Sequence, residues 1–330
     1  MDAYPYGTLN GLDTEELFIM IYLLVERYLT DREKHCGPLR GNTNGATPRF
    51  TDAEVLTVSI VGELKQPPSE RAWYHELNTT WKALFPELLE RSRLLRRKIA
   101  LGPVLESFRR KLLEYLGLDE QPERFIDSKP VILAHYGRAR RNLNKRFRTF
   151  WLRDKHSGIL YQVEPGMACI GFCATKNEHY FGMKLHMMIS FAGIPLGWGL
   201  TAANIDDREM VCPLLDIDPR VQRGGNIRIW SDNGYESQEY EIVVRELGHE
   251  LHAFPKKAKA NKWPRALRRW VRKHRQKLET KFSEGKRFVN LETPRAASER
   301  GLLAQMATKI TALTLYMLAP ILPQVAEMRL

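Results

Sequence analysis

The sequence predicts an α/β fold in which a mixed sheet follows an all-helical N-terminal domain. Up to about residue 118, apolar residues recur at three- and four-residue spacing, which is typical of helices. From about residue 122, short runs rich in β-branched and aromatic residues are separated by turns. Strands that alternate with helices form a sheet covered by those helices. We therefore predict a helical domain at 1–118 and an α/β domain at 119–330.

Four helical patterns make up the predicted N-terminal domain. Thr51 is followed three residues later by Glu54, the arrangement of a capping box, so a helix is expected to begin there. Gly102 and Pro103 should break or kink the last helix. Small Arg-rich helical domains often contain a helix-turn-helix that binds DNA, but a packing domain with a solvated basic face is an equally good interpretation. The four patterns cover residues 14–30, 51–64, 69–81 and 92–118.

The predicted α/β domain contains β-rich runs with helical patterns between them. Their order is three strands, a helix, a strand, a helix, a strand and a final long helix. This is the order of an RNase H-like domain, whose sheet has mixed strand directions. The β-rich runs cover residues 124–134, 180–193, 194–203, 226–234 and 249–255. The helical patterns cover residues 206–215, 237–247 and 265–288.

The composition favours a polyanionic partner, and charge alone leaves DNA, RNA and an acidic membrane open. The 330 residues include 51 Lys and Arg against 39 Asp and Glu, which gives a formal net charge of +12. No apolar run approaches the roughly 18 residues that span a bilayer, and no basic leader precedes the first helix. We therefore expect a cytoplasmic protein without a membrane partner.

The four cysteines do not suggest a disulfide-stabilised, secreted fold. Cys169 and Cys173 lie near His179 and His186 in the sequence, so a zinc site can be imagined. This spacing matches no standard zinc module, and ordinary half-buried thiols are the stronger interpretation.

Residues 137–162 are dense in Arg and Lys, with aromatic residues between them. Such a mixture suits contacts with phosphates and stacking on bases, although most charge runs are solvated loops. The candidate DNA contacts in this segment are Arg138, Arg140 and Arg141.

Three carboxylates occupy positions that a functional role would explain. Asp127 lies inside an apolar strand run, where burial of a charge without a partner or a metal is costly. Asp232 ends another strand run, so the two aspartates can meet at one end of a sheet. Glu279 lies on a basic amphipathic helix, where it could also be only the surface partner of Arg275, one turn away.

Phosphodiester cleavage explains why three carboxylates would be gathered in a basic protein. Two divalent ions about 3.5 to 4 Å apart can activate an attacking water and stabilise the leaving oxygen. Mg²⁺ and Mn²⁺ prefer the oxygen ligands that Asp127, Asp232 and Glu279 would provide. Neighbouring Arg and Lys side chains can hold the DNA backbone. Three carboxylates would therefore suit a two-metal site that acts on DNA, with the surface pair of Glu279 and Arg275 as the alternative.

Six motifs, in order along the chain, resemble those of DDE transposases of bacterial insertion sequences. The resemblance is to the nine-eight-two insertion-sequence family and, more broadly, to the insertion-sequence-four-like clan. It spans most of the chain, because residues 50–64 also resemble the helical N-terminal region of that group. The motifs are IDS at 126–128, GRAR at 137–140, YFGMKLH at 180–186, TAANIDDRE at 201–209, SDNGY at 231–235 and LETKFS at 278–283.

This resemblance implies a retroviral-integrase-like catalytic fold with a metal-binding catalytic triad of Asp127, Asp232 and Glu279. Arg275 and Lys286 match the spacing of basic residues around the family's glutamate, so they are candidate DNA contacts. The implied reaction is binding of insertion-sequence ends followed by metal-dependent DNA strand cleavage and strand transfer, with two Mg²⁺ or Mn²⁺ ions. The implied partners are terminal inverted repeats and target DNA, with a homodimer in the synaptic complex at the bacterial nucleoid.

Two of these motifs, YFGMKLH and TAANIDDRE, contain further charged residues. Lys184 is a candidate DNA contact, although strand residues of this kind, like the nearby His186, are more often structural neighbours. Residues 206–208 are expected to shape the turn into a helix through capping. Two other functions would fit the same motifs: a catalytically inactive DNA-binding relative, and an RNase H-like nuclease without strand transfer.

Overall fold

A computed structural model describes residues 13–39, 48–135, 150–153, 160–164, 168–173, 176–254 and 264–321. These residues divide into two compact units. The helical unit contains the described residues up to Leu116, then Arg287–Asn290, and those from Leu303 onward. The sheet unit contains Gly117–Lys286 and Leu291–Leu302. The sequence-based division into 1–118 and 119–330 does not include this return of the chain to the helical unit.

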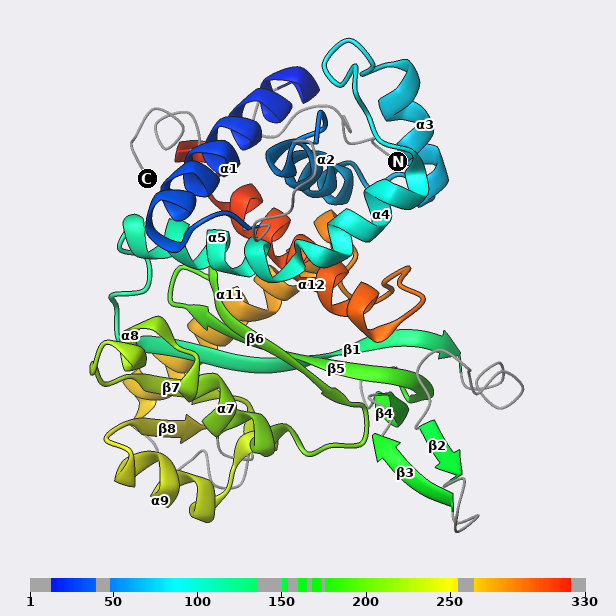
Figure 1. The fold of residues 1–330 in the computed structure, drawn as a ribbon. Coiled ribbons are helices and arrows are strands. Elements are labelled where there is room, and N and C mark those ends of the chain that lie inside the picture. Colours follow the sequence, from blue (N-terminus) through cyan, green and yellow to red (C-terminus); the bar gives the residue numbers. More distant parts are fainter. Residues whose placement is uncertain are drawn as a thin grey trace, which may run out of the picture. The chain divides into compact units, whose positions relative to one another are not determined.

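Local sequence signals set the helix ends in the helical unit. The capping box at Thr51 is confirmed: the Glu54 N–H donates to the Thr51 hydroxyl at 3.1 Å, and the Thr51 N–H donates to Glu54 Oε2 at 2.6 Å. The break at Gly102 is also confirmed, because one helix ends at Ala100 and the next begins at Gly102. The helices, labelled in Figure 1, are α1 (Thr14–Cys36), α2 (Asp52–Lys65), α3 (Glu70–Thr79), α4 (Arg91–Ala100), α5 (Gly102–Tyr115) and α12 (Glu299–Met317), followed by the short η3 (Ala319–Ile321).

Helix α12 is an element that the periodicity did not predict. Its residues Met306, Ile310 and Leu313 are fully buried, and so are several of its polar residues, Thr308 and Thr311 among them. A helix that is buried around most of its circumference lacks the amphipathic stripe by which helices are recognised in a sequence. The segment therefore has no clear period despite forming a regular helix.

The main sheet of the sheet unit has mixed strand directions, as predicted. Among the described residues it has six strands in the order β4-β5-β1-β7-β8, and β6 pairs with β5. The β4, β6 and β1 pairings with β5 are antiparallel, whereas β1 to β7 and β7 to β8 are parallel. The strands are β1 (Glu123–His135), β4 (Cys169–Cys173), β5 (Glu178–Ser190), β6 (Pro195–Ala202), β7 (Arg228–Ser231) and β8 (Glu250–Ala253).

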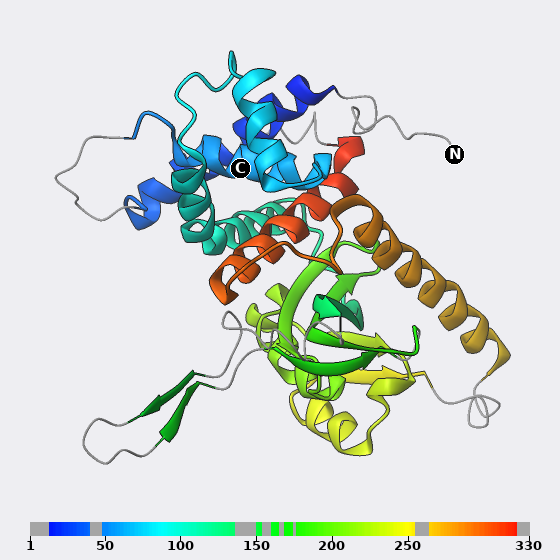
Figure 2. The same cartoon turned by 90° about the vertical axis from the view of Figure 1, so that its right-hand side faces the viewer.

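Helices cover both faces of this sheet. An apolar core that includes Ile126, Ile229 and Leu251 packs the sheet against α7 and α9. On the opposite face, Trp270 of α11 packs on Trp230, with ring centroids 4.9 Å apart. Figures 1 and 2 both show α11 on the other side of the sheet from α7 and α9. The helical elements are η1 (Asp207–Met210), α7 (Val211–Asp216), α8 (Pro219–Gln222), η2 (Asn233–Tyr235), α9 (Gln238–Glu246) and α11 (Arg265–Val289).

The basic segment at 137–162 overlaps two strands that the sequence did not predict. These are β2 (Phe150–Arg153) and β3 (Leu160–Glu164), which pair in antiparallel fashion as a separate two-stranded sheet. Arg138, Arg140 and Arg141 lie outside the described residues. No helix within the described ranges is long and apolar enough to cross a membrane.

Candidate active site

The register of two parallel strands brings Asp127 and Asp232 to the same place. Strand β1 pairs with β7 so that Ile126 stands opposite Ser231, the last residue of β7. The next residue on each chain is an aspartate, and parallel strands advance by the same distance per residue. Asp127 and Asp232 are therefore neighbours at the point where β7 ends and β1 continues.

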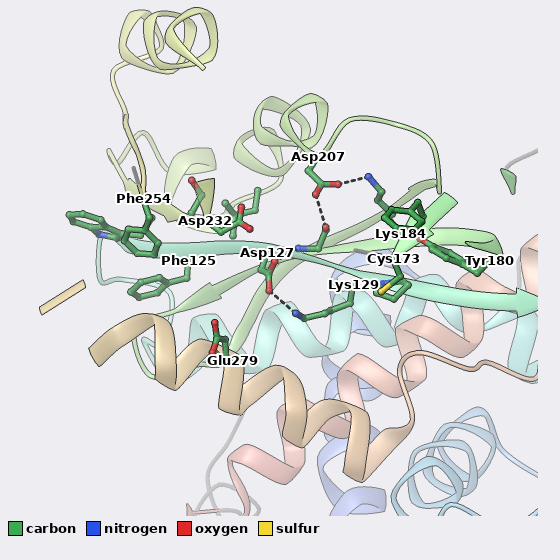
Figure 3. A pocket seen from close by; sticks show the side chains of 16 residues that line it. Phe125, Asp127, Lys129, Cys173, Tyr180, Lys184, Asp207, Asp232, Phe254 and Glu279 are labelled. Carbon is green, nitrogen blue, oxygen red and sulfur yellow. Dashed lines mark hydrogen bonds and ion pairs between the residues drawn. The ribbon is translucent and has the colours of Figure 1, made fainter. Parts of the chain in front are cut away.

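Glu279 of α11 lines the same cavity as the two aspartates. The cavity has a volume of about 600 Å³ and opens where β1 extends beyond the end of β7. In Figure 3, Asp127 and Lys129 project from β1 on the side of α11, and Glu279 projects from α11 toward them. Aromatic rings complete the wall. The lining includes Phe125, Asp127, Ser128, Lys129, Phe172, Tyr180, Lys184, Asp207, Trp230, Asp232, Phe254 and Glu279.

Asp232 is oriented by the turn that follows its strand. Its carboxylate accepts a hydrogen bond from the Gly234 N–H at 2.9 Å and caps η2. A Cβ atom at Gly234 would lie only 3.0 Å from Asp232 Oδ1, so a glycine suits this tight turn. The following Tyr235 is buried in the core beneath the sheet. The SDNGY motif thus fixes the aspartate at the strand end from its own local structure.

Asp127 is a largely desolvated carboxylate with two partners. Its Oδ1 accepts a hydrogen bond from the Ser128 N–H at 2.8 Å, and its Oδ2 lies 3.1 Å from the ammonium of Lys129. Burial raises the pKa of Asp127, and the nearby charge of Asp232 raises this pKa further, while Lys129 opposes both effects. A buried carboxylate in this state is stabilised by any cation that approaches it.

A second polar cluster lies on the other side of β1. The Lys184 ammonium donates to Asp207 Oδ1 and to the Ile205 carbonyl, each at 2.7 Å. The other oxygen of Asp207 accepts a hydrogen bond from the Ser128 hydroxyl at 2.8 Å. Figure 3 shows Asp207 and Lys184 on the face of β1 opposite Lys129. Asp207 therefore ties β5 to β1 directly behind Asp127.

The capping expected at residues 206–208 is found at Asp206, whose side chain accepts from the Arg208 N–H. Asp207 instead points into the polar cluster. His186 is fully buried, and burial lowers its pKa to about 4. Its Nε2 lies 2.8 Å from the Thr201 hydroxyl. His186 is thus a neutral structural neighbour of the site.

Sequence reasoning gave no site role to Lys129, and it expected Asp207 only to help cap a helix. Lys129 could have been found from the two-residue period of a strand, which puts it on the same face as Asp127. Asp207 lacked such a signal because its partners, Lys184 and Ser128, are distant in sequence. Arg275 and Lys286 lie on α11, and their side chains are outside the described part of the structure.

The donor set of this cavity suits a hard divalent cation. Three carboxylates line it, and oxygen ligands are those that Mg²⁺ and Mn²⁺ prefer. Burial raises the pKa of Asp127, one of the three. Within the described ranges, no three His, Cys, Asp or Glu side chains are grouped closely enough to hold a metal ion.

Comparison with solved structures found distant similarity to transposases. A piggyBac transposase synaptic complex with hairpin DNA has a TM-score of 0.45 and 10% identity, covering 96% of this chain and 76% of that chain. A pre-cleavage Mos1 transpososome has a TM-score of 0.23 and 10% identity, covering 88% and 86%. TM-scores of this size do not establish a common fold.

Comparison of sequences identifies a family for this chain. A putative transposase for insertion sequence element IS402 from Burkholderia cepacia is 32% identical over 75 residues, which cover 21% of this chain and 36% of that relative. The family described as transposase DDE domain matches residues 122–315, more than half of the chain. The predicted resemblance to insertion-sequence DDE transposases is thereby confirmed. Since the matched region contains the strands and the helix that carry all three carboxylates, this chain belongs to the transposase DDE domain family.

Proposed function

We propose that this protein binds insertion-sequence ends and catalyses metal-dependent DNA strand cleavage and strand transfer. The observation that carries the proposal is the shared cavity of Asp127, Asp232 and Glu279, within the region that matches the family. The sheet order β4-β5-β1-β7-β8 supports an RNase H-like catalytic domain. The net charge of +12 supports DNA as the partner. A homodimer that joins two element ends is part of the proposal.

In this proposal, Asp127, Asp232 and Glu279 hold two Mg²⁺ or Mn²⁺ ions. The bound ions would supply an activated nucleophile and charge stabilisation at the scissile phosphate. The Ser128 N–H and the Gly234 N–H each hold one aspartate in a fixed orientation. The rings of Phe125, Trp230 and Phe254 are buried and form a packed wall beside the carboxylates.

Isosteric substitution of each carboxylate tests the proposal. Asp127→Asn, Asp232→Asn and Glu279→Gln keep the side-chain shape but remove a negative charge from the cavity. Each should abolish cleavage of a labelled element end and its joining to a target plasmid in Mg²⁺, while folding and DNA binding persist. Because the three residues would act as one unit, double variants should be hardly worse than single ones. Excess EDTA should also abolish activity.

Glu246→Gln is a matched control, because Glu246 is exposed on α9 and does not line the cavity. It should cut and join DNA at the wild-type rate. A folded Glu279→Gln protein with near wild-type cleavage would remove Glu279 from the proposed triad. Cleavage without joining by the wild-type protein would favour a nuclease, and DNA binding without cleavage would favour an inactive relative.

A further inference from the structure

The ammonium of Lys129 contacts the carboxylate of Asp127 inside the cavity. Both side chains leave β1 on the same face, because residues two apart on a strand share a face. The Lys129 Nζ is 3.1 Å from Asp127 Oδ2, and both side chains line the cavity. Figure 3 shows this contact on the side of β1 toward Glu279. A cation of the protein itself therefore compensates the carboxylate.

Both oxygens of Asp127 are already engaged in this arrangement. The Ser128 N–H donates to Oδ1, and Lys129 contacts Oδ2. Each carboxylate oxygen has further lone pairs, so a metal ion can still bind to Asp127. The metal ion and the Lys129 ammonium are both positive, so they would repel each other at this short distance. Repulsion between the two positive charges therefore favours displacement of the ammonium when a divalent ion binds.

Lys129 is more exposed than Lys184, which also lines the cavity. The Lys129 side chain is 35% exposed. The Lys184 side chain is 20% exposed, and its ammonium donates to Asp207 and to the Ile205 carbonyl. A lysine is a flexible point charge that can exchange one anion for another. The nearest anion that substrate would bring into this cavity is a DNA phosphate.

We propose that Lys129 is an exchangeable counter-ion, which neutralises Asp127 before metal binds and contacts a DNA phosphate once metal has displaced it. This inference rests on the proposed function, since it assumes that Asp127 binds metal. It predicts that Lys129 weakens metal binding in the free protein yet strengthens DNA binding in the metal-loaded protein. A purely structural lysine would do neither.

The first measurement is Mn²⁺ binding to the purified full-length protein without DNA, followed by calorimetry or by electron paramagnetic resonance. Lys129→Met should bind Mn²⁺ about threefold more tightly than wild type, the size expected for loss of a partly exposed ion pair. Lys129→Arg keeps the charge and should restore wild-type affinity. Lys176→Met is the matched control, because it removes an ammonium that lies 2.8 Å from Glu292 elsewhere in the sheet unit.

The second measurement is DNA affinity as a function of salt, with Ca²⁺ present to allow binding with little turnover. Lys129→Met should reduce the slope of log affinity against log salt by about 0.9, the value for one phosphate contact. In EDTA its slope should equal that of wild type, because there Lys129 remains on Asp127. A slope that is reduced equally with and without metal would contradict the exchange.

Asp127→Asn separates failure of this inference from failure of the proposed function. If Asp127→Asn loses Mn²⁺ binding while Lys129→Met binds Mn²⁺ like wild type, the counter-ion role of Lys129 is wrong and the metal site stands. If Asp127→Asn binds Mn²⁺ like wild type, Asp127 is not a metal ligand and both proposals fail. Circular dichroism should show that every variant retains the wild-type fold.

Discussion

At the scale of single residues, each aspartate of the site is oriented by a neighbour close in sequence. Asp127 accepts from the Ser128 N–H, and Asp232 accepts from the Gly234 N–H. These contacts depend only on the local chain path, so a short motif is enough to encode them. Asp207 differs, because Lys184 and Ser128 reach it from distant strands.

The contacts of Asp207 predict a specific cost for its removal. Asp207→Ala removes the carboxylate that pairs with the Lys184 ammonium and that accepts the hydrogen bond of the Ser128 hydroxyl. Lys184 and Asp207 are 20% and 27% exposed, so the cost should lie between those of exposed and buried pairs, at about 2 kcal/mol. Urea unfolding of the full-length protein measures it.

Asp206→Ala provides the comparison for this prediction. Asp206 pairs with Arg208, but both side chains are more exposed, at 43% and 37%, and Asp206 also caps η1 by accepting from the Arg208 N–H. Loss of this exposed pair and the cap together should cost about 1 kcal/mol. If Asp207→Ala were no more damaging than Asp206→Ala, the link between β5 and β1 would contribute nothing measurable.

Asp127 and Asp232 stand out in the sequence because each is a carboxylate on an apolar strand run. Glu279 does not stand out in this way, since a glutamate on a basic helix is explained by a surface pair with Arg275, and only the family motif singled it out. The sequence was not sufficient for Asp207, whose contacts depend on a side chain 23 positions away and another 79 positions away. Pairings between distant residues leave no trace in the local pattern of a single sequence.

At the scale of secondary-structure elements, the same contrast holds. Helix α2 and the break before α5 were predicted because a capping box and a Gly-Pro pair are local signals. The short strand β4 was missed, since it exists through its pairing with β5. Helix α12 was missed because burial on most sides removes its period.

A buried ion-pair cluster connects α2, α4 and α12 within the helical unit. Glu63 lies 2.7 Å from the Lys309 ammonium and 3.4 Å from that of Lys98, and all three side chains are almost fully buried. Gln305 also donates to Glu63 at 3.4 Å. Burial raises the pKa of Glu63, but Lys98 and Lys309 together outweigh burial, so the net pKa lies below its usual 4.5.

This lowered pKa predicts acid sensitivity of the helical unit. A carboxylate with a depressed pKa in the folded state stabilises above its unfolded pKa, and that stability is lost as pH falls through the folded value. Glu63→Gln should cost about 3 kcal/mol at pH 7, since it leaves two buried ammonium groups undercompensated. The difference in unfolding free energy between wild type and Glu63→Gln should then shrink as pH falls below 4.5.

Urea unfolding at a series of pH values checks this prediction. Glu114→Gln is the control, because Glu114 forms an exposed pair with Lys111 on α5. Its effect should stay below about 1 kcal/mol at every pH. A cost of Glu63→Gln that is independent of pH would show that its charge does not stabilise the fold.

At the scale of the whole molecule, the chain leaves the helical unit and later returns to it. The family match begins near the start of the sheet unit and ends at residue 315, inside α12. The matched region therefore includes a helix that belongs to the helical unit from Leu303 onward. A linear division of the chain into an N-terminal and a C-terminal domain cuts through the core of one unit.

This topology predicts that a fragment of residues 1–118 will not fold by itself. A test of DNA-end recognition therefore needs more of the chain than this fragment. The fragment lacks Met306, Ile310 and Leu313, each fully buried, and burial of such a side chain is worth about 1.5–3 kcal/mol. It also lacks Lys309, and with it one of the two buried cations beside Glu63. The stabilisation lost with these side chains is comparable with the whole free energy of unfolding of a domain, about 5–15 kcal/mol.

A chain that joins residues 13–118 to 299–321 through a flexible linker restores these contacts. It also restores the packing of Ala304 against Gly102, where an added Cβ would lie 3.0 Å from Ala304. We expect this joined chain to unfold cooperatively in urea and the 1–118 fragment to show no cooperative transition. Element-end binding should then be compared between the joined chain and the full-length protein, because an unfolded fragment reports nothing about recognition. If residues 1–118 alone unfolded cooperatively and as stably as the joined chain, α12 would be an accessory to the helical unit and the two-domain division predicted from the sequence would be sufficient.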